Sequence, residues 1–206
     1  RRRRRLPLGV CFPAVVKRGL TLSAANVSHE WIGLHAEELF EQALGRDIHF
    51  INDADAAGVA ELRYGAARGV EGLVILTTLG TGIGSAFLSD GVLVPNTELG
   101  HLELDGDDAE HRAAYSAMER EELDWAEWAA RLQRYYAHLG MLFSPDLFIV
   151  GGGVSKHHEQ FLPLLDLTTP IVPPCTETTP GSSARIARGR LSSAAPVPGG
   201  SGASGR

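Results

Sequence analysis

The apolar positions of this chain repeat at two spacings, one typical of β-strands and one typical of α-helices. Strands are predicted by short runs at residues 46–51 and 147–150 and by a continuous apolar run at residues 73–78. Helices are predicted by the alanine-rich stretch at residues 54–65 and by apolar side chains at helical spacing over residues 123–143. The alternation of strands and helices predicts an α/β fold.

Two local signals refine these elements. An Asp-Gly dipeptide at residues 90–91 lies between the apolar runs at residues 85–88 and 92–94, and such a dipeptide is a strong signal for a β-hairpin. Asp124 precedes the long helix and Glu127 follows three residues later, as in a capping box. A hairpin beside the buried strands predicts a sheet of mixed strand directions.

The composition is that of an ordinary folded protein. The chain has 206 residues, of which 44% are hydrophobic and 21% are charged. No apolar run approaches the roughly 20 residues that a membrane-spanning helix needs. The net charge is −6, and acidic side chains outnumber basic ones over residues 6–172. We therefore expect neither a membrane nor a nucleic-acid partner, because nucleic-acid binding relies on a basic surface.

The two cysteines and the two ends of the chain suggest little chemistry. Cys11 and Cys175 cannot form a disulfide framework or a zinc cage by themselves, and no signal peptide is visible, so we expect a cytoplasmic location. Residues 1–5 are all arginine and could in principle hold a polyanion, but a disordered end is the simpler interpretation. Residues 173–206 are rich in Pro, Gly, Ser, Ala and Arg and are predicted to be disordered.

The first candidate for chemistry is the polar pair at the end of a predicted strand, Asn52 and Asp53. A carboxylate there, next to an amide that can bind hydroxyl groups, suits a general base that acts on an alcohol. Because a helix is predicted to begin at the following residue, Asp53 could instead be the helix N-cap. Taken alone, these residues leave both interpretations open.

Two glycine-rich segments follow predicted strands. The segment at residues 80–84 reads G-T-G-I-G, and its backbone N–H groups could cradle phosphate oxygens. Because a strand follows it, and not a helix, it is neither a dinucleotide-binding fingerprint nor a Walker loop. The segment at residues 151–153 reads G-G-G and would let a ligand approach the backbone closely. A tight turn and a simple connecting loop are the alternatives.

A third candidate site combines acids and a histidine, namely Glu98, His101 and Glu103. Carboxylates and an imidazole form a good set of partners for the hydroxyl groups of a sugar. Metal binding is conceivable, although no cysteine lies nearby, and a solvated acidic loop is the alternative.

The order of these motifs resembles that of the ROK family of sugar kinases: N-D-A-D-A-A, then L-G-T-G-I-G-S, then E-L-G-H-L-E, then G-G-G-V-S. Longer phrases such as L-F-S-P-D-L-F-I-V-G-G-G-V-S-K resemble the polyphosphate-using glucokinase branch of that family. The resemblance covers residues 9–172. It implies an actin-like ATPase (ribonuclease H-like) fold with an incomplete first lobe, in which residues 6–52 are the remnant of the N-terminal lobe and residues 53–172 form the C-terminal lobe.

The resemblance also implies roles for the candidate residues. Asp53 matches the catalytic base of the family, which accepts the proton of the glucose 6-hydroxyl. The other matching residues are, on the sugar side, Asn52, Glu98, His101 and, as a weaker candidate, Glu103, and, on the side of the phosphates and nucleotide, Gly80, Thr81, Gly82, Gly84, Gly151, Gly152 and Gly153.

The implied reaction is in-line transfer of a phosphoryl group to the 6-hydroxyl of glucose from polyphosphate, with ATP as a second candidate donor and Mg²⁺ bound with the donor. The resemblance also implies a homodimer. No zinc is expected, because residues 102–122 contain no cysteine, unlike the zinc-binding members. The sequence does not decide between the donors, although Arg63 and Arg68 could contact a polyanion, and it leaves the range of accepted hexoses open.

The chain departs from the family at both ends. The family opens with D-x-G-G-T, which binds Mg²⁺ and the transferred phosphate, and this motif does not occur in the 206 residues. The family also closes with an Ala- and Gly-rich helix. We expect both ends to be altered and the activity of this chain to be impaired, which makes a non-catalytic glucose-binding protein the main alternative. A fragment that does not fold is another, and a repressor would need a helix-turn-helix segment ahead of residue 6.

Overall fold

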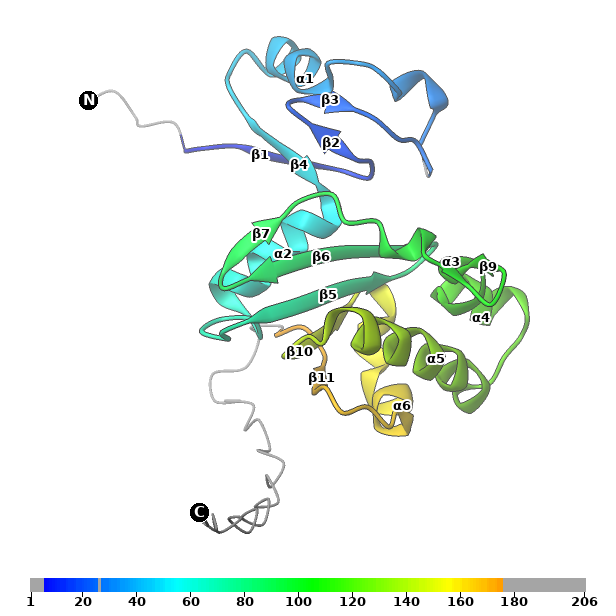
Figure 1. Ribbon diagram of the computed structural model, residues 1–206. Coiled ribbons are helices and arrows are strands. Elements are labelled where there is room, and N and C mark those ends of the chain that lie inside the picture. Colours follow the sequence, from blue (N-terminus) through cyan, green and yellow to red (C-terminus); the bar gives the residue numbers. More distant parts are fainter. Residues whose placement is uncertain (1–5, 26, 176–206) are drawn as a thin grey trace, which may run out of the picture. The chain divides into compact units, whose positions relative to one another are not determined.

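The computed structural model describes residues 6–25 and 27–175. In its first part, two strands pair in parallel and a helix lies beside them (Figure 1). The rings of Phe12, Phe40 and Phe50 pack together with the ring of Trp31, and neighbouring centroids are 4.8–6.4 Å apart. The elements are β1 (Gly9–Phe12), β2 (Val16–Lys17), β3 (Leu20–Thr21), a 3₁₀ turn (His29–Trp31), α1 (Ala36–Leu44) and β4 (His49–Asn52).

A five-stranded sheet with the order β11-β10-β5-β6-β7 organises the rest of the described chain. Strand β10 pairs in parallel with β5 and β11, whereas β6 is antiparallel to both of its neighbours, β5 and β7. The predicted sheet of mixed strand directions is therefore confirmed. Its strands are β5 (Leu73–Leu79), β6 (Ile83–Ser89), β7 (Val92–Val94), β10 (Leu147–Gly151) and β11 (Ile171–Val172).

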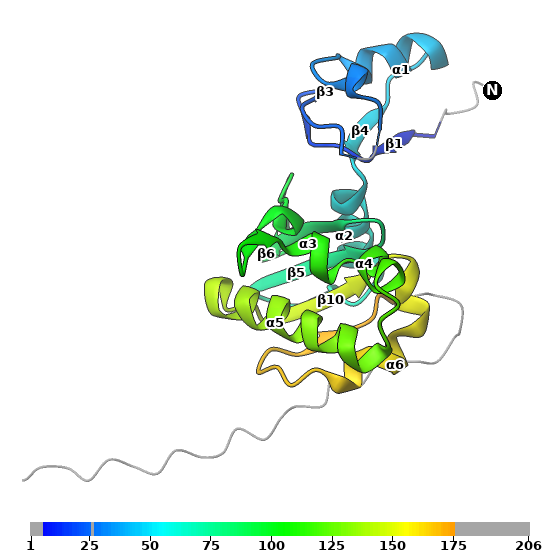
Figure 2. The same cartoon turned by 90° about the vertical axis from the view of Figure 1, so that its right-hand side faces the viewer.

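Helices cover both faces of this sheet (Figure 2). Alternate residues of β5 point to opposite faces, so Ile75 packs in the cluster built on α5, and Val74 and Leu76 pack in a cluster that includes side chains of α2. Gly58 lets α2 approach β6 closely, because a Cβ at this position would lie 2.7 Å from that of Ala86. The helices of this part are α2 (Asp53–Tyr64), α3 (Ala109–Ala113), α4 (Tyr115–Arg120), α5 (Trp125–Phe143) and α6 (His158–Phe161). Three 3₁₀ turns lie at Leu99–His101, Gly153–His157 and Leu162–Leu164, and two short strands are β8 (Glu103–Leu104) and β9 (Asp107–Asp108).

The local signals of the sequence are confirmed in detail. Asp90 and Gly91 both have positive φ, 48° and 78°, as a two-residue hairpin turn requires. Asp124 caps α5, and its side chain and that of Glu127 form the predicted reciprocal pair of hydrogen bonds. None of the helices in the described part of the chain combines the length and the apolar character needed to cross a membrane.

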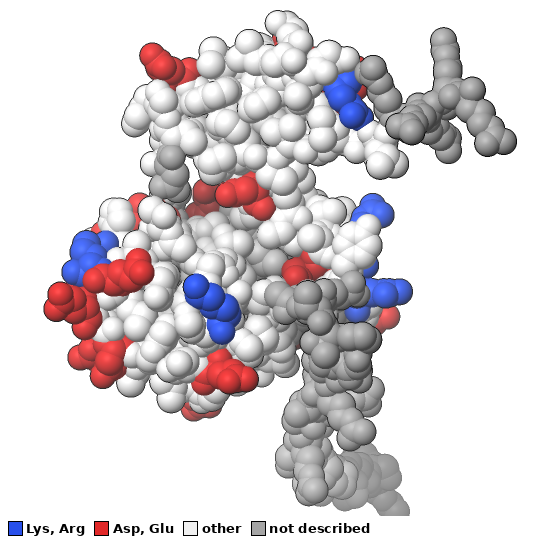
Figure 3. Space-filling view, turned by 180° about the vertical axis from the view of Figure 1, so that it is seen from behind, with Lys and Arg blue, Asp and Glu red and all other residues white. Residues whose placement is uncertain are grey.

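The proposed division of the chain is only partly covered by the structure. Strand β4 ends at Asn52, where the boundary between two lobes is expected, and the lobes themselves stay a prediction. Residues 176–206, which make up most of the tail predicted to be disordered, lie outside the described residues. On the face shown in Figure 3, basic side chains are scattered among acidic ones and form no continuous patch within the described part.

Candidate active site

A cavity of about 530 Å³ brings together most of the residues singled out in the sequence. Its walls come from the segment after β1, the first turn of α2, the turn between β5 and β6, the 3₁₀ turn that contains His101 and the turn after β10. The predicted site residues that line it are Asn52, Asp53, Gly80, Thr81, Gly82, Gly84, Glu98, His101, Gly152 and Gly153.

The first turn of α2 places the Asp53 carboxylate in the cavity, where its Oδ1 accepts a hydrogen bond of 2.9 Å from the backbone N–H of Ala54. Asn52 is the helix N-cap, and its Oδ1 accepts a hydrogen bond of 3.0 Å from the backbone N–H of Asp55. The alternative interpretation of Asp53 as the N-cap is therefore wrong, since Asp53 is the first residue of the helix itself. Its side chain is exposed, and the helix dipole favours a negative charge at this end.

Asn52 has a second structural bond besides its capping bond. Its Nδ2 donates to the carbonyl oxygen of Ala14 over 3.0 Å, which ties the segment after β1 to the start of α2. Asn52 is buried, and one amide hydrogen remains for a ligand. The sugar contact predicted for Asn52 can therefore use that hydrogen or the second lone pair of Oδ1.

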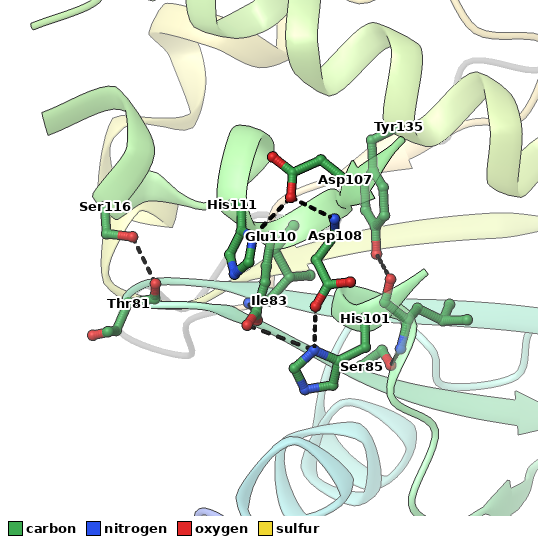
Figure 4. Close-up of polar contacts among 11 residues, drawn as sticks. Thr81, Ile83, Ser85, His101, Asp107, Asp108, Glu110, His111, Ser116 and Tyr135 are labelled. Atoms are coloured by element: carbon green, nitrogen blue, oxygen red, sulfur yellow. Dashed lines mark hydrogen bonds and ion pairs between the residues drawn. The ribbon is translucent and has the colours of Figure 1, made fainter. Parts of the chain in front are cut away.

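The turn between β5 and β6 is held in shape by bonds to its carbonyl groups. The backbone N–H of Ser116 donates to the carbonyl oxygen of Gly80 over 3.0 Å. The Oγ of Ser116 donates to the carbonyl oxygen of Thr81 over 2.6 Å (Figure 4). The N–H of Gly80 donates to the carbonyl oxygen of Gly82. Within the described residues, the N–H groups of Thr81 and Gly82 have no partner, so they are available for an anion.

The glycine turn after β10 packs against the end of β5. Gly152 has a φ of 86°, and a Cβ there would lie 2.7 Å from the backbone nitrogen of Leu79. Only glycine fits this position without strain. Gly151 is the last residue of β10, opposite Thr78, and it does not line the cavity. Glu103 is also outside the lining, because it pairs with Asp108 in the short ladder of β8 and β9.

His101 faces two carboxylates (Figure 4). Its Nδ1 lies 3.2 Å from Oδ2 of Asp108 and 3.7 Å from Oε1 of Glu110. The other oxygen of Glu110 accepts a hydrogen bond of 3.1 Å from the backbone N–H of Ile83. Glu110 therefore connects the histidine to the glycine turn, and it lines the cavity itself.

Glu98 sits on a segment that Ser85 anchors. The Oγ of Ser85 donates to the carbonyl oxygen of Thr97 over 2.6 Å and accepts from the N–H of Leu99 over 3.1 Å. Desolvation by the surrounding protein raises the pKa of Glu98, and the nearby His101 opposes this rise. The acidic neighbours of Glu98 raise its pKa further.

Asp55 is a buried carboxylate beside this segment, with 1% of the residue exposed. Its Oδ2 accepts a hydrogen bond of 2.9 Å from the backbone N–H of Asn96. Its Oδ1 is buried without a hydrogen-bond partner among the described residues. Burial raises the pKa of Asp55, the bond from Asn96 opposes the rise, and the charge of Asp53 adds to it.

Sequence reasoning missed Glu110, Ser85 and Asn96. Glu110 lies in an acidic stretch with no motif of its own, and Ser85 ends the L-G-T-G-I-G-S motif, which gives it no role of its own. Among the described residues, no group of three or more His, Cys, Asp or Glu side chains is arranged to hold a metal ion.

In sequence, the chain is similar to bacterial sugar kinases. Residues 1–120 match the model of the ROK family. Over 176 residues the chain is 47% identical to a polyphosphate glucokinase of Mycobacterium tuberculosis (strain CDC 1551 / Oshkosh). The matched residues make up 85% of this chain and 66% of that protein. The chain thus spans just under two thirds of the length of this curated relative.

Solved structures share the fold. The crystal structure of an inorganic polyphosphate/ATP-glucomannokinase from Arthrobacter sp. strain KM matches with a TM-score of 0.80 and 56% identity, over 82% of this chain and 67% of that one. A ROK family glucokinase from Streptomyces griseus, in complex with glucose and AMPPNP, matches with a TM-score of 0.67 over 82% of this chain and 75% of that one. Its identity is 22%, so this second likeness concerns the fold alone.

Proposed function

The chain belongs to the ROK family, and from this membership we propose that it is a glucokinase, which transfers a phosphoryl group from polyphosphate or ATP to the 6-hydroxyl of glucose. The predicted fold class, the actin-like ATPase fold of that family, is confirmed by the likeness to its solved members. The polyphosphate and glucose parts of the proposal are supported by the names of the similar proteins from Mycobacterium tuberculosis and Arthrobacter.

One structural observation carries the proposal: the Asp53 carboxylate and the glycine turn at residues 80–84 line the same cavity. A phosphoryl transfer to an alcohol needs a group that accepts the hydroxyl proton and, beside it, donors that hold the phosphate. The free N–H groups of Thr81 and Gly82 are such donors, and Asp53 is such an acceptor.

In this proposal the sugar is bound by two carboxylates and a histidine that line the cavity. Glu98 and Glu110 accept hydrogen bonds from sugar hydroxyl groups, and the Nε2 of His101 is the ring nitrogen left for a further hydroxyl. These contacts orient the 6-hydroxyl towards Asp53. The proton of that hydroxyl passes to the Asp53 carboxylate as the oxygen forms a bond to phosphorus, and the bond from phosphorus to the remaining phosphate chain breaks. The catalysis therefore rests on positioning and electrostatics.

A divalent cation such as Mg²⁺ would supply charge neutralisation for the donor phosphates. Such an ion keeps several waters and is held through phosphate oxygens with one or two carboxylates, so it requires no group of three protein ligands. The D-x-G-G-T motif, which holds Mg²⁺ in the family, does not occur in the 206 residues, so with this chain the ion would be held mainly through the phosphate oxygens of the donor. The further partners proposed for the chain are a second copy of itself and the polyphosphate or ATP donor.

Formation of glucose 6-phosphate by the purified chain tests the proposal. The assay contains Mg²⁺ and either polyphosphate or ATP, with glucose or mannose as acceptor, and Asp53→Asn is the control. If the unchanged chain forms glucose 6-phosphate and Asp53→Asn does not, the result would support the proposed kinase activity, and the donor that gave the product would be identified. Glucose binding without formation of product would favour the alternative of a non-catalytic sugar-binding protein. The reduced catalytic activity expected of this chain stays a prediction until this assay is done. Absence of both product and glucose binding would contradict the proposal.

A further inference from the structure

Asn96 joins two parts of the chain that are 80 residues apart. Its side-chain Oδ1 accepts a hydrogen bond of 2.8 Å from the backbone N–H of Val16, and its Nδ2 donates to the carbonyl oxygen of Val16 over 2.8 Å. Both polar atoms of the amide therefore bind one residue of β2, as a neighbouring strand would. Asn96 has a φ of 59°, a conformation that asparagine tolerates better than most residues.

The backbone of Asn96 is held from another side by Asp55. The buried Oδ2 of Asp55 accepts the N–H of Asn96 over 2.9 Å. Asp55 belongs to the first turn of α2, two residues after Asp53. The turn that presents the proposed catalytic base is thus bonded directly to the segment that follows β7.

That segment presents Glu98 to the cavity two residues later. Asn96 is bonded to β2 and α2, and Thr97 is bonded to Ser85 on β6 through both its carbonyl and its hydroxyl. Three separate elements therefore fix the backbone immediately before Glu98. A ligand-binding side chain gains precision when the backbone that carries it is fixed in this way.

We propose that Asn96 and Asp55 are positioning residues, which set the Glu98 carboxylate relative to Asp53 so that both can bind one glucose molecule. This inference rests on the proposed function, because it assigns the sugar site to Glu98 and Asp53. Neither Asn96 nor Asp55 lines the cavity, so they act through the backbone they hold.

The chain offers a matched control for this arrangement. Gln133 on α5 binds Asp166 by the same two-bond arrangement, donating to its carbonyl oxygen and accepting from its N–H, each over 2.8 Å. Gln133 does not line the cavity. The informative pair of variants is therefore Asn96→Gly and Gln133→Ala. Glycine at position 96 deletes the amide without adding left-handed strain, since glycine adopts positive φ freely.

Two measurements on the full chain test the proposal: calorimetric titration with D-glucose, and amide hydrogen exchange of the peptide that contains residues 95–99. We expect Asn96→Gly to weaken glucose binding about tenfold and to speed exchange in this peptide, because two hydrogen bonds are lost. Gln133→Ala is expected to leave the glucose affinity and the exchange rate of residues 95–99 the same as in the unchanged chain.

The outcomes separate this inference from the proposed function. Unchanged exchange at residues 95–99 in Asn96→Gly would overturn the inference, whatever happens to glucose. Faster exchange with unchanged glucose affinity would also overturn it, since Glu98 would then not depend on Asn96. If the unchanged chain binds no glucose, the proposed function fails and with it the sugar-positioning role, while exchange still reports whether Asn96 holds the segment.

Discussion

Nδ1 of His101 and Oδ2 of Asp108 lie 3.2 Å apart, so the carboxylate engages one nitrogen of the imidazole ring. This contact favours a proton on Nδ1 and leaves Nε2 as the nitrogen that can meet a ligand in the cavity. Asp108 thereby fixes both the tautomer and the ring orientation of a residue that lines the proposed sugar site.

The first prediction follows from that contact. Asp108→Asn removes the charge that holds the ring, and we expect glucose affinity to fall by a factor of about three to ten, because the pair is partly exposed and screened by solvent. Asp107→Asn is the matched control, since Asp107 pairs with His111 over 2.9 Å and neither residue lines the cavity. Equal losses in the two variants, measured by calorimetry, would contradict the assigned role.

The second prediction concerns the two glycine turns. A methyl group added at Gly80 meets nothing within 4 Å, so Gly80→Ala should fold as the unchanged chain does. The methyl group would occupy the space where a phosphate approaches the backbone. We expect the affinity for polyphosphate or ATP to drop about tenfold with glucose affinity kept, as measured by separate titrations. An unaltered donor affinity would count against phosphate binding at this turn.

Gly152→Ala provides the contrast. Here the added methyl group meets the backbone of Leu79, and the φ of 86° is unfavourable for alanine. We expect this variant to lose several kcal/mol of unfolding free energy. A thermal melt that matches that of Gly80→Ala would show that the turn after β10 does not pack on β5 as described.

The third prediction concerns pH. Desolvation raises the pKa of Glu98 above its ordinary value of 4.5, and only the ionised carboxylate accepts hydrogen bonds at both oxygens. Glucose affinity should therefore fall as the pH drops through a value above 4.5, and this loss should be absent in Glu98→Gln. The raised pKa means that the folded chain binds this proton more tightly than the unfolded chain does, so protonation of Glu98 itself favours folding. Titrations at several pH values decide the point, and identical pH profiles of the two proteins would refute it.

The fourth prediction concerns the buried support of the site. Thr77 Oγ1 and the hydroxyl of Tyr136 are 2.6 Å apart, both are fully buried, and Thr77 lies on the strand that leads into the glycine turn. Tyr136→Phe leaves the threonine hydroxyl unpaired and should cost about 1–3 kcal/mol of unfolding free energy. The double change Tyr136→Phe with Thr77→Val removes both polar groups and should recover much of that loss. Strictly additive effects in denaturant unfolding would contradict the pairing.

Local signals in the sequence predicted much of the fold. The hairpin at Asp90 and Gly91 and the capping box of Asp124 and Glu127 depend on neighbours within a few residues, so they can be read without the tertiary structure. At the start of α2, Asn52 and Asp53 are both good capping residues by type. Asn52, which is the N-cap, is also bonded to Ala14, 38 residues away. A contact over that distance cannot be recognised from the local sequence.

The candidate site was predicted where motifs exist and missed where contacts are long-range. Glu98 and His101 belong to a recognisable phrase, but no pattern in the sequence shows which residues hold them in place. Asn96 meets Val16 across 80 residues, and Glu110 meets Ile83 across 27. Such bonds arise from the packing of separate elements, so no periodic pattern in the sequence predicts them.

The central claim, that Asp53 faces the 6-hydroxyl of a bound glucose, is tested most directly by a cycle of four titrations. The unchanged chain and Asp53→Asn are each titrated with glucose and with 6-deoxyglucose. We predict that removing the 6-hydroxyl weakens binding to the unchanged chain about tenfold, and that the same removal has little further effect once Asp53 is changed. An equal loss in both proteins, or no binding of glucose to the unchanged chain, would contradict the account.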